Sequence, residues 1–265
     1  MFSHKLNINF IMTILQTKFL NLLNDFGYDI FNLKMIRETN TFSDKEISQV
    51  LRTLTKSGIL IKLEQGKYIK NGFHNEFVIG SFLAPDGGIA YWSALNFHGL
   101  TEQFPNVIHI QTANRRGTSI INNLRYRFIK INKRKLTGYT LQGYGNHAFK
   151  ITNVEKTIVD CFDLPHHAGW YHETIKAFAN AKINARKLTK YCKDINNVSV
   201  IKRLGYLSEL IKKPDMTFFV NYAQTCLKNE YSLFEIGGNN TGTYNKRWKL
   251  ILNLPEQEIL EIAKS

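Results

Sequence analysis

The chain has 265 residues, of which 43% are hydrophobic and 12% aromatic, and its formal net charge is +14. This length and composition exclude a disordered chain and predict one small and one medium-sized domain, each with an apolar core. No apolar run approaches the roughly 18 residues that a membrane-spanning helix needs, and polar residues interrupt the apolar opening segment, so we expect neither a membrane span nor a signal peptide. The charge favours a polyanionic partner, although a chain rich in Lys, Asn and Ile can be basic without one.

The cysteines are few and scattered, and they contain no C-x-x-C pair: Cys161, Cys192 and Cys226. An odd, widely spaced set argues against a disulfide scaffold or a zinc ribbon and suits a reducing compartment. We therefore expect a cytoplasmic protein in which these are ordinary thiols.

The first seventy residues begin with a pattern of two helices. Apolar residues at helical spacing predict a first helix over Phe10–Asp25, and Gly27 is suited to end it. A second, short helix fits Leu33–Thr39, with Asn32 as its N-cap residue. A short turn at residues 40–42 then joins it to a third helix, as a helix-turn-helix requires.

The third predicted helix has two different faces. Ser43 and Glu46 form a capping box at its start, and Gly58 supplies a left-handed cap after its end. One face is apolar and comprises Ile47, Val50, Leu51 and Leu54. The opposite face is a polar, cationic stripe that comprises Lys45, Ser48, Gln49, Arg52 and Lys56.

After Gly58 the hydrophobic period changes from 3.6 to 2, which predicts a hairpin. Ile59, Ile61 and Leu63 alternate with a second set on the other face: Leu60, Lys62 and Glu64. Gln65-Gly66 turns the chain, and Lys67–Lys70 returns as the second strand. Three helices followed by a basic hairpin predict a winged helix-turn-helix domain over residues 1–72.

A winged helix of this kind predicts a specific mode of DNA binding. The third helix enters the major groove, where Gln49 reads adenine, Arg52 reads guanine, and Ser48 contacts base edges or phosphate. The backbone is held by lysines of the helix and the wing, namely Lys45, Lys56, Lys62 and Lys67. Two alternatives stay open, because a polar stripe is often only a solvated face and winged helices also bind proteins.

The pattern breaks at Asn71–Asn75, and residues 76–265 are predicted to form a larger domain. Short helices are expected at Phe77–Leu83 and Ser93–Gly99. Strands are expected at Val107–Gln111, Leu124–Ile131, Tyr139–Tyr144 and His147–Ile151. Helices are then expected at Val154–Phe162, His172–Ala181, Arg186–Cys192, Val198–Ile211 and Phe218–Leu227. Trp248–Leu252 is expected to return to the sheet before a final short helix, which together predicts an α+β fold.

One stretch of the larger domain, residues 113–135, is strongly basic and contains no Asp or Glu. Its cations are Arg115, Arg116, Arg125, Arg127, Lys130, Lys133, Arg134 and Lys135. On a strand, Arg125 and Arg127 share one face, so we expect a second surface for the DNA backbone. An acidic protein partner, or carboxylates elsewhere in the fold, would explain the stretch equally well. A further basic run, Lys182–Lys193, is interpreted as a solvated helix face.

Candidate catalytic and metal-binding residues are few. His166, His167 and His172 lie near acidic residues, but their spacing matches no standard metal-ligand set. Glu155 and Asp160 suggest a nuclease centre, yet on an amphipathic helix solvent exposure or capping accounts for them as well. No phosphate loop, nucleophile elbow or dinucleotide fingerprint is present. We therefore expect no enzyme, metal or cofactor, with a winged-helix-targeted, restriction-type nuclease or a protein-interaction module as alternatives.

Four segments follow one another in a characteristic order. SDKEISQVLRTLTKSGILIKLEQGKYI is followed by YWSALNFHGL, then by FKITNVEKTIVDCFD, and near the end by YNKRWKLILN. In this order the chain resembles the AbiEi-type antitoxins of type IV toxin–antitoxin, or abortive-infection, systems, which are often described as transcriptional regulators of viral defence. The resemblance runs from about residue 10 to residue 253, and it depends on the order and spacing of loose motifs.

The resemblance implies that the N-terminal domain binds inverted repeats in its own promoter and represses transcription. It also implies that the C-terminal domain counters a nucleotidyltransferase toxin encoded beside it, with or without a stable complex, and that basic residues of both domains contact double-stranded DNA. No catalytic role is transferred to the motif residues, whose positions are structural in such proteins: Ser93, Glu155, Lys156, Thr157 and Asp160. The segment Met1–Asn9 departs from the family by its length, which leaves extra contacts such as self-association open.

Overall fold

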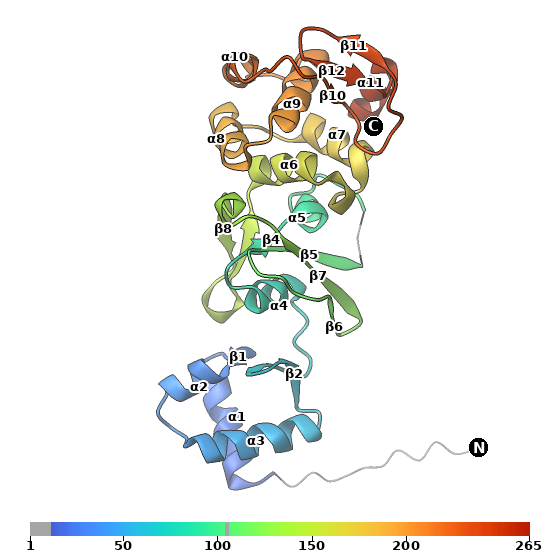
Figure 1. Ribbon diagram of the computed structural model, residues 1–265. Helices are drawn as coiled ribbons and strands as arrows, with labels where there is room; N and C mark the ends of the chain where they lie inside the picture. The colour runs from blue at the N-terminus through green and yellow to red at the C-terminus, as the bar shows by residue number, and fades with distance from the viewer. Residues whose placement is uncertain (1–11, 104–105) are drawn as a thin grey trace, which may run out of the picture. The chain divides into compact units, whose positions relative to one another are not determined.

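The computed structural model describes residues 12–103 and 106–265 and has an α+β fold (Figure 1). The chain divides into two units by its internal contacts. Unit 1 comprises the residues up to Asn75 together with Tyr144–His147, and unit 2 comprises Glu76–Gly143 and Ala148–Ser265. The predicted extension at Met1–Asn9 lies outside the described residues.

In the described residues, unit 1 has three helices and three short strands in the order α1, β1, α2, α3, β2, β3. Their bounds are Ile14–Asp25, Ile30–Asn32, Leu33–Glu38, Asp44–Lys56, Leu60–Glu64 and Lys67–Lys70. The strands form a sheet of order β1-β3-β2, in which both pairs are antiparallel. The three predicted helices and the predicted hairpin are therefore confirmed. The strand β1 was not predicted, because three residues are too few to show a period of two, and it forms by pairing with β3.

Local hydrogen bonds determine where the helices of unit 1 begin. Thr13 caps α1 in a capping box with Gln16, so the predicted first helix is too long at its N-terminal end. The Asn32 side chain accepts a hydrogen bond from the Met35 N–H at 3.0 Å, which begins α2 as predicted. These caps satisfy backbone N–H groups that a helix start otherwise leaves without a partner.

The core of unit 1 consists of apolar side chains from all three helices and from the sheet. They are Phe19, Leu22, Leu23, Phe31, Ile36, Ile47, Val50, Leu51, Leu54 and Leu60. Burial of this apolar surface is the main favourable term in folding, and it fixes which way α3 faces. Leu60 at the start of β2 belongs to this core, whereas Lys62, two residues further along the strand, is exposed.

Unit 2 contains a mixed sheet whose described strands follow the order β6-β7-β5-β4-β9-β8. The strands are β4 (Gly88–Ile89), β5 (Val107–Thr112), β6 (Ser119–Ile121), β7 (Leu124–Lys130), β8 (Tyr139–Gln142) and β9 (Phe149–Thr152). Figure 1 shows α4 (Glu76–Leu83) on one face of this sheet and α5 (Tyr91–Phe97) on the other. The predicted strands at Val107–Gln111 and Leu124–Ile131 are confirmed.

A layer of helices follows the sheet in unit 2, and the helices predicted in this region are all confirmed. They are α6 (Val154–Asp163), α7 (Trp170–Asn180), α8 (Ala185–Ile195), α9 (Val198–Leu210) and α10 (Thr217–Thr225). Two short 3-10 turns are η1 (Lys133–Lys135) and η3 (Pro165–His167). The helix α6 contacts α5, α7, α8 and α9, so it lies inside the unit rather than on its surface.

The last strand of the chain corrects the prediction that Trp248–Leu252 returns to the main sheet. Instead, β12 (Leu250–Leu252) lies in a separate sheet between β10 (Ser232–Leu233) and β11 (Thr243–Asn245). Trp248 gives the physical reason, because its buried ring packs so closely on Gly205 that a Cβ atom there would lie 2.1 Å from it. This contact holds the segment on α9, and α11 (Glu256–Lys264) follows as predicted.

Candidate nucleic-acid interface

The helix α3 is fixed at both ends by the predicted caps. The Ser43 N–H donates to Glu46 Oε2 at 2.9 Å, and Ser43 Oγ accepts from the Glu46 N–H at 3.4 Å. Hydrogen bonds from the Ser43 hydroxyl and N–H lower the pKa of Glu46, so the helix start keeps a negative charge that suits the helix dipole. Gly58, with a φ of 73°, follows the end of the helix as predicted.

The two faces of α3 lie as the sequence predicts. Ile47, Val50, Leu51 and Leu54 are buried in the core of unit 1. The side chains of the opposite stripe are all exposed: Lys45, Ser48, Gln49, Arg52 and Lys56. Within the described part of the chain, none of these five side chains has an ion-pair or hydrogen-bond partner. The stripe is therefore available to a ligand.

The acidic residues of α3 do not oppose this stripe, because they lie at the start of the helix and are already occupied. Asp44 accepts from Arg37 Nε at 2.7 Å, and Glu46 belongs to the capping box. Both carboxylates are therefore held by residues other than the cations of the stripe.

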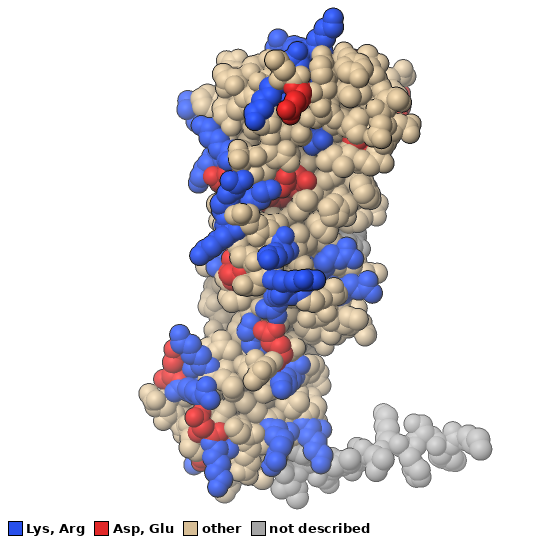
Figure 2. All heavy atoms as spheres, in the orientation of Figure 1, with Lys and Arg blue, Asp and Glu red and all other residues tan. Residues whose placement is uncertain are grey.

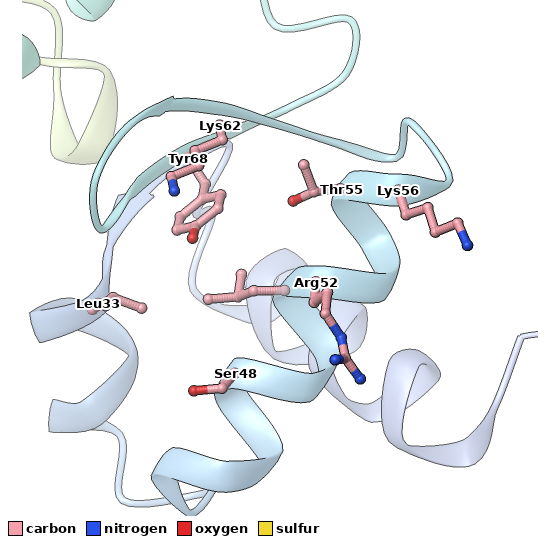
Figure 3. Close-up of a pocket in the computed structure, with 8 residues that line it drawn as sticks. Leu33, Ser48, Arg52, Thr55, Lys56, Lys62 and Tyr68 are labelled. Carbon is pink, nitrogen blue, oxygen red and sulfur yellow. The ribbon is translucent and has the colours of Figure 1, made fainter.

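A groove of about 430 Å³ separates α3 from the β2–β3 hairpin (Figure 3). Its lining residues include no carboxylate and are Leu33, Ser48, Leu51, Arg52, Thr55, Lys56, Lys62 and Tyr68. Thr55 and Tyr68 were not predicted from the sequence as members of this surface. The structure pairs Tyr68 with Lys62 across the hairpin, which places both side chains on the same side of it.

The lysines of the hairpin differ in their surroundings. Lys62 is exposed at the groove. Lys67 forms an ion pair with Glu64 at 2.8 Å, and its side chain is only 18% exposed. Of the two wing cations that the sequence predicts to contact DNA, Lys62 is therefore the better placed.

The basic stretch of unit 2 does not lie on one surface. Arg125 and Arg127 share a face of β7 as predicted, and strand alternation places Lys130 on the opposite face. Arg115, Lys133 and Arg134 are exposed in the segments beside β7.

Two cations of the same stretch have partners within unit 2. Arg116 donates to the Leu83 carbonyl oxygen, and its guanidinium carbon lies 4.6 Å from the centroid of the Phe128 ring. Lys135 forms an ion pair with Asp163 at 2.7 Å. These two side chains stabilise the fold, as the alternative of neutralisation by distant carboxylates predicts for Lys135.

The charged residues Glu155 and Asp160 of α6 are buried, which corrects the interpretation that they are exposed to solvent. Glu155, Lys156 and Asp160 are at most 7% exposed. Lys156 Nζ donates to Asp160, whose second oxygen accepts from Gln111 Nε2 at 2.7 Å, and Tyr139 donates to Gln111 Oε1 at 3.0 Å. Burial raises the pKa of Asp160, and the paired Lys156 opposes that shift. This network joins α6 to the sheet.

Glu155 is also used by the fold, since its carboxylate accepts from the Asn184 N–H at 3.0 Å, next to the start of α8. Both carboxylates of the suggested nuclease centre are thus buried and hydrogen-bonded to the protein. They offer no open pair to a metal ion or to a scissile phosphate.

The histidine segment after α6 is spread between the surface and the interior. His166 and His172 are exposed, and His167 is half-buried with its pKa lowered to about 4, mainly by burial. His109 on β5 was not singled out from the sequence; it is buried, which lowers its pKa to about 3. Among the residues that the structure describes, no group of three or more His, Cys, Asp or Glu side chains is arranged to hold a metal ion.

On the face drawn in Figure 2, basic side chains predominate over acidic ones on each unit, in keeping with the net charge of +14. None of the helices within residues 12–103 and 106–265 combines the length and the apolar character that crossing a bilayer requires. The molecule is thus an α+β protein in which one surface helix of unit 1 carries a free cationic stripe.

Comparison with known proteins bears on the fold. No family model matches the chain, and none of the curated proteins matches it. The chain is similar in structure to the RV2827C protein from Mycobacterium tuberculosis, whose crystal structure superposes on it with a TM-score of 0.62 and 13% sequence identity. The superposition covers 96% of this chain and 96% of the RV2827C chain. At this identity the similarity shows a shared fold and carries no ligand or activity to this chain.

Proposed function

We propose that this protein is a sequence-specific transcriptional repressor that binds double-stranded DNA through unit 1, which acts as a winged helix. The proposal rests on one observation: the exposed stripe of α3 has no partner among the residues that the structure describes, and the other face of the helix is anchored in the core. A helix held in this way is able to enter a major groove about 12 Å wide without unfolding any part of the domain.

In the proposed complex, the residues of the stripe have different tasks. The Arg52 guanidinium donates two hydrogen bonds to a guanine, and the Gln49 amide pairs with an adenine. Lys45 and Lys56 on the helix, with Lys62 on the hairpin, contact phosphates and set the register without reading sequence. The tasks are separable, because base contacts change sequence preference and phosphate contacts change the dependence on salt.

The exposed cations of unit 2 extend the proposal to a second, weaker contact with the DNA backbone. Arg115, Lys133 and Arg134 are exposed, as is Arg125 on one face of β7, where the half-buried Arg127 lies beside it. Lys130 is exposed on the opposite face of β7, so it contributes to a different surface from Arg125. Arg116 and Lys135 are left out of this contact because unit 2 already uses them.

The resemblance to AbiEi-type antitoxins supplies the biological setting of the proposal. We infer that the protein represses its own promoter at inverted repeats and counters a nucleotidyltransferase toxin encoded beside it. A growth assay tests this part, in which the neighbouring gene is induced with and without this protein. Rescue of growth is expected, and equal growth arrest in both cultures would remove the antitoxin assignment while leaving DNA binding untouched.

A mobility-shift titration on the upstream promoter region tests DNA binding directly. The double variant Gln49→Ala, Arg52→Ala is expected to lose sequence preference and to bind the promoter at least tenfold more weakly, since each good base contact contributes about 1–3 kcal/mol. Lys187→Ala is the matched control, because Lys187 is an exposed cation on α8 of unit 2. Equal affinity and preference in the wild type and the double variant would discard the assignment of α3.

A further inference from the structure

The groove between α3 and the hairpin contains hydroxyl groups that the fold does not use. Ser48, Thr55 and Tyr68 line it. Within residues 12–103 and 106–265, none of these side chains makes a hydrogen bond, and the Thr55 oxygen is buried as well. A buried hydroxyl without a partner costs stability, so its presence in the wall of a groove calls for an explanation.

The neighbouring hydroxyls show that this arrangement is not a general property of α3. Thr53 Oγ1 and Ser57 Oγ each donate to the carbonyl oxygen three residues earlier, at 3.0 and 3.1 Å. This is the usual way in which Ser and Thr are satisfied on a helix. Ser48 and Thr55 instead turn their hydroxyls toward the groove, as Figure 3 shows.

The other wall of the groove is provided by the hairpin, and its geometry is fixed. Tyr68 stacks on Phe31 with ring centroids 5.8 Å apart and an angle of 20° between the rings. Lys62 is the cross-strand neighbour of Tyr68, so its ammonium group lies on the same side of the hairpin as the Tyr68 hydroxyl. A ligand in the groove thus meets hydroxyl donors on both walls and a positive charge.

We propose that this groove is a phosphate-binding subsite that holds one phosphate group of the DNA backbone. Ser48, Thr55 and Tyr68 donate hydrogen bonds to its oxygens, and Lys62 balances its charge. A phosphate group is the natural ligand, because its oxygens only accept hydrogen bonds and the lining residues include donors and cations but no carboxylate. This inference rests on the proposed function and adds uncharged groups to the residues that hold the DNA.

Thr55 has a simple route to such a ligand. Threonine has two favourable χ1 positions in a helix, and rotation from one to the other points its hydroxyl in a different direction. When the groove is empty the hydroxyl has no acceptor, and a phosphate oxygen would supply one. Replacement of Thr55 by Val should therefore raise the melting temperature slightly while it weakens DNA binding, and these effects have opposite signs.

The test compares Thr55→Val and Tyr68→Phe with the control Thr53→Val, whose hydroxyl already has a backbone acceptor. All three changes keep shape and charge. Each groove variant is expected to bind every duplex about tenfold more weakly, because hydrogen bonds to a charged group are lost. Sequence preference and the slope of log K against log salt should both stay at the wild-type value, since no cation has been removed.

The outcomes separate this subsite from DNA binding as a whole. If the wild type binds the promoter and both groove variants match Thr53→Val within twofold, the subsite is refuted and the repressor proposal stands. A binding site for phosphate is also measurable without DNA, by titrating inorganic phosphate into the full chain and following backbone NMR signals. Shifts at Thr55 and Tyr68 that disappear in the double variant Thr55→Val, Tyr68→Phe support the subsite even if promoter binding fails; no shifts and no promoter binding would remove both proposals.

Discussion

Two amphipathic helices, α3 of unit 1 and α6 of unit 2, look alike in sequence and differ in structure. Each begins with a side-chain cap, Ser43 or Asn153, and each carries charged residues opposite an apolar face. The cations of the α3 stripe are exposed and have no partner among the described residues, whereas Glu155, Lys156 and Asp160 of α6 are buried and hydrogen-bonded. Periodicity therefore shows which residues share a face, and only the neighbouring elements decide whether that face meets water, protein or a ligand.

The difference has an energetic basis. A buried charge is tolerated only when it is paired and hydrogen-bonded, which the network of Lys156, Asp160 and Gln111 provides. An exposed cation needs no such partner, because water solvates it and the ligand has only to displace that water. Charges on α6 are thus expected to matter for stability, and charges on α3 for binding.

The largest effect is expected when the pair in α6 is broken. Asp160→Ala should lower the free energy of unfolding by about 3–5 kcal/mol in urea titrations, because Lys156 is left buried without its partner. Arg52→Ala on α3 should leave that free energy nearly unchanged. The double variant Lys156→Met, Asp160→Leu should recover part of the loss, but not all of it, since Gln111 still lacks an acceptor. An Asp160→Ala protein as stable as the wild type would contradict the claim that the charges of α6 stabilise the fold.

A second effect concerns the acid sensitivity of unit 2. Burial lowers the pKa of His109 to about 3 and that of His167 to about 4, so the folded state takes up their protons less readily than the unfolded chain. The contribution of each neutral histidine to the free energy of unfolding is therefore complete above the unfolded pKa near 6.5. It decreases as the pH falls below that value, by roughly 1.4 kcal/mol per pH unit for each histidine. His109→Gln should reduce this slope between pH 6.5 and 5 in urea titrations, and an unchanged slope would show that His109 is not held neutral.

The smallest effect concerns the lysines around the groove of unit 1. Each lysine that contacts a phosphate contributes roughly −0.9 to the slope of log K against log salt. Lys62→Gln is expected to make the slope less steep by about one, and Lys67→Gln to change it less, because Lys67 is held by Glu64. Titrations of the promoter fragment at several salt concentrations measure both. A larger change for Lys67 than for Lys62 would reverse the roles given to them.

Local signals predicted much of unit 1, because its caps and turns depend on residues close in sequence. The capping box of Ser43 and Glu46, the Asn32 cap and the turn at Gly66 all lie where the sequence indicates. Short strands such as β1 and β6 have no local signal, since their backbone hydrogen bonds depend on distant partners. The prediction that Trp248–Leu252 returns to the main sheet was wrong for the same reason, because the partners of a strand lie far from it in the sequence.

The candidate site was predictable to the extent that it lies on one helix. The five residues of the α3 stripe follow from helical spacing alone. Thr55 and Tyr68 were missed because membership of the groove requires the hairpin to fold back over the helix, which no spacing along the chain reveals. The burial of Glu155 and Asp160 was missed for a similar reason, since it depends on elements distant in sequence, namely the main sheet and the helices around α6.

The central claim is that α3 reads base edges, and a panel of promoter duplexes with single base-pair changes tests it most directly. The wild type should discriminate against changes at one guanine by about 1–3 kcal/mol, and Arg52→Ala should lose that discrimination at this position while keeping it elsewhere. The same discrimination profile for both proteins would contradict the account, because Arg52 would then touch no base.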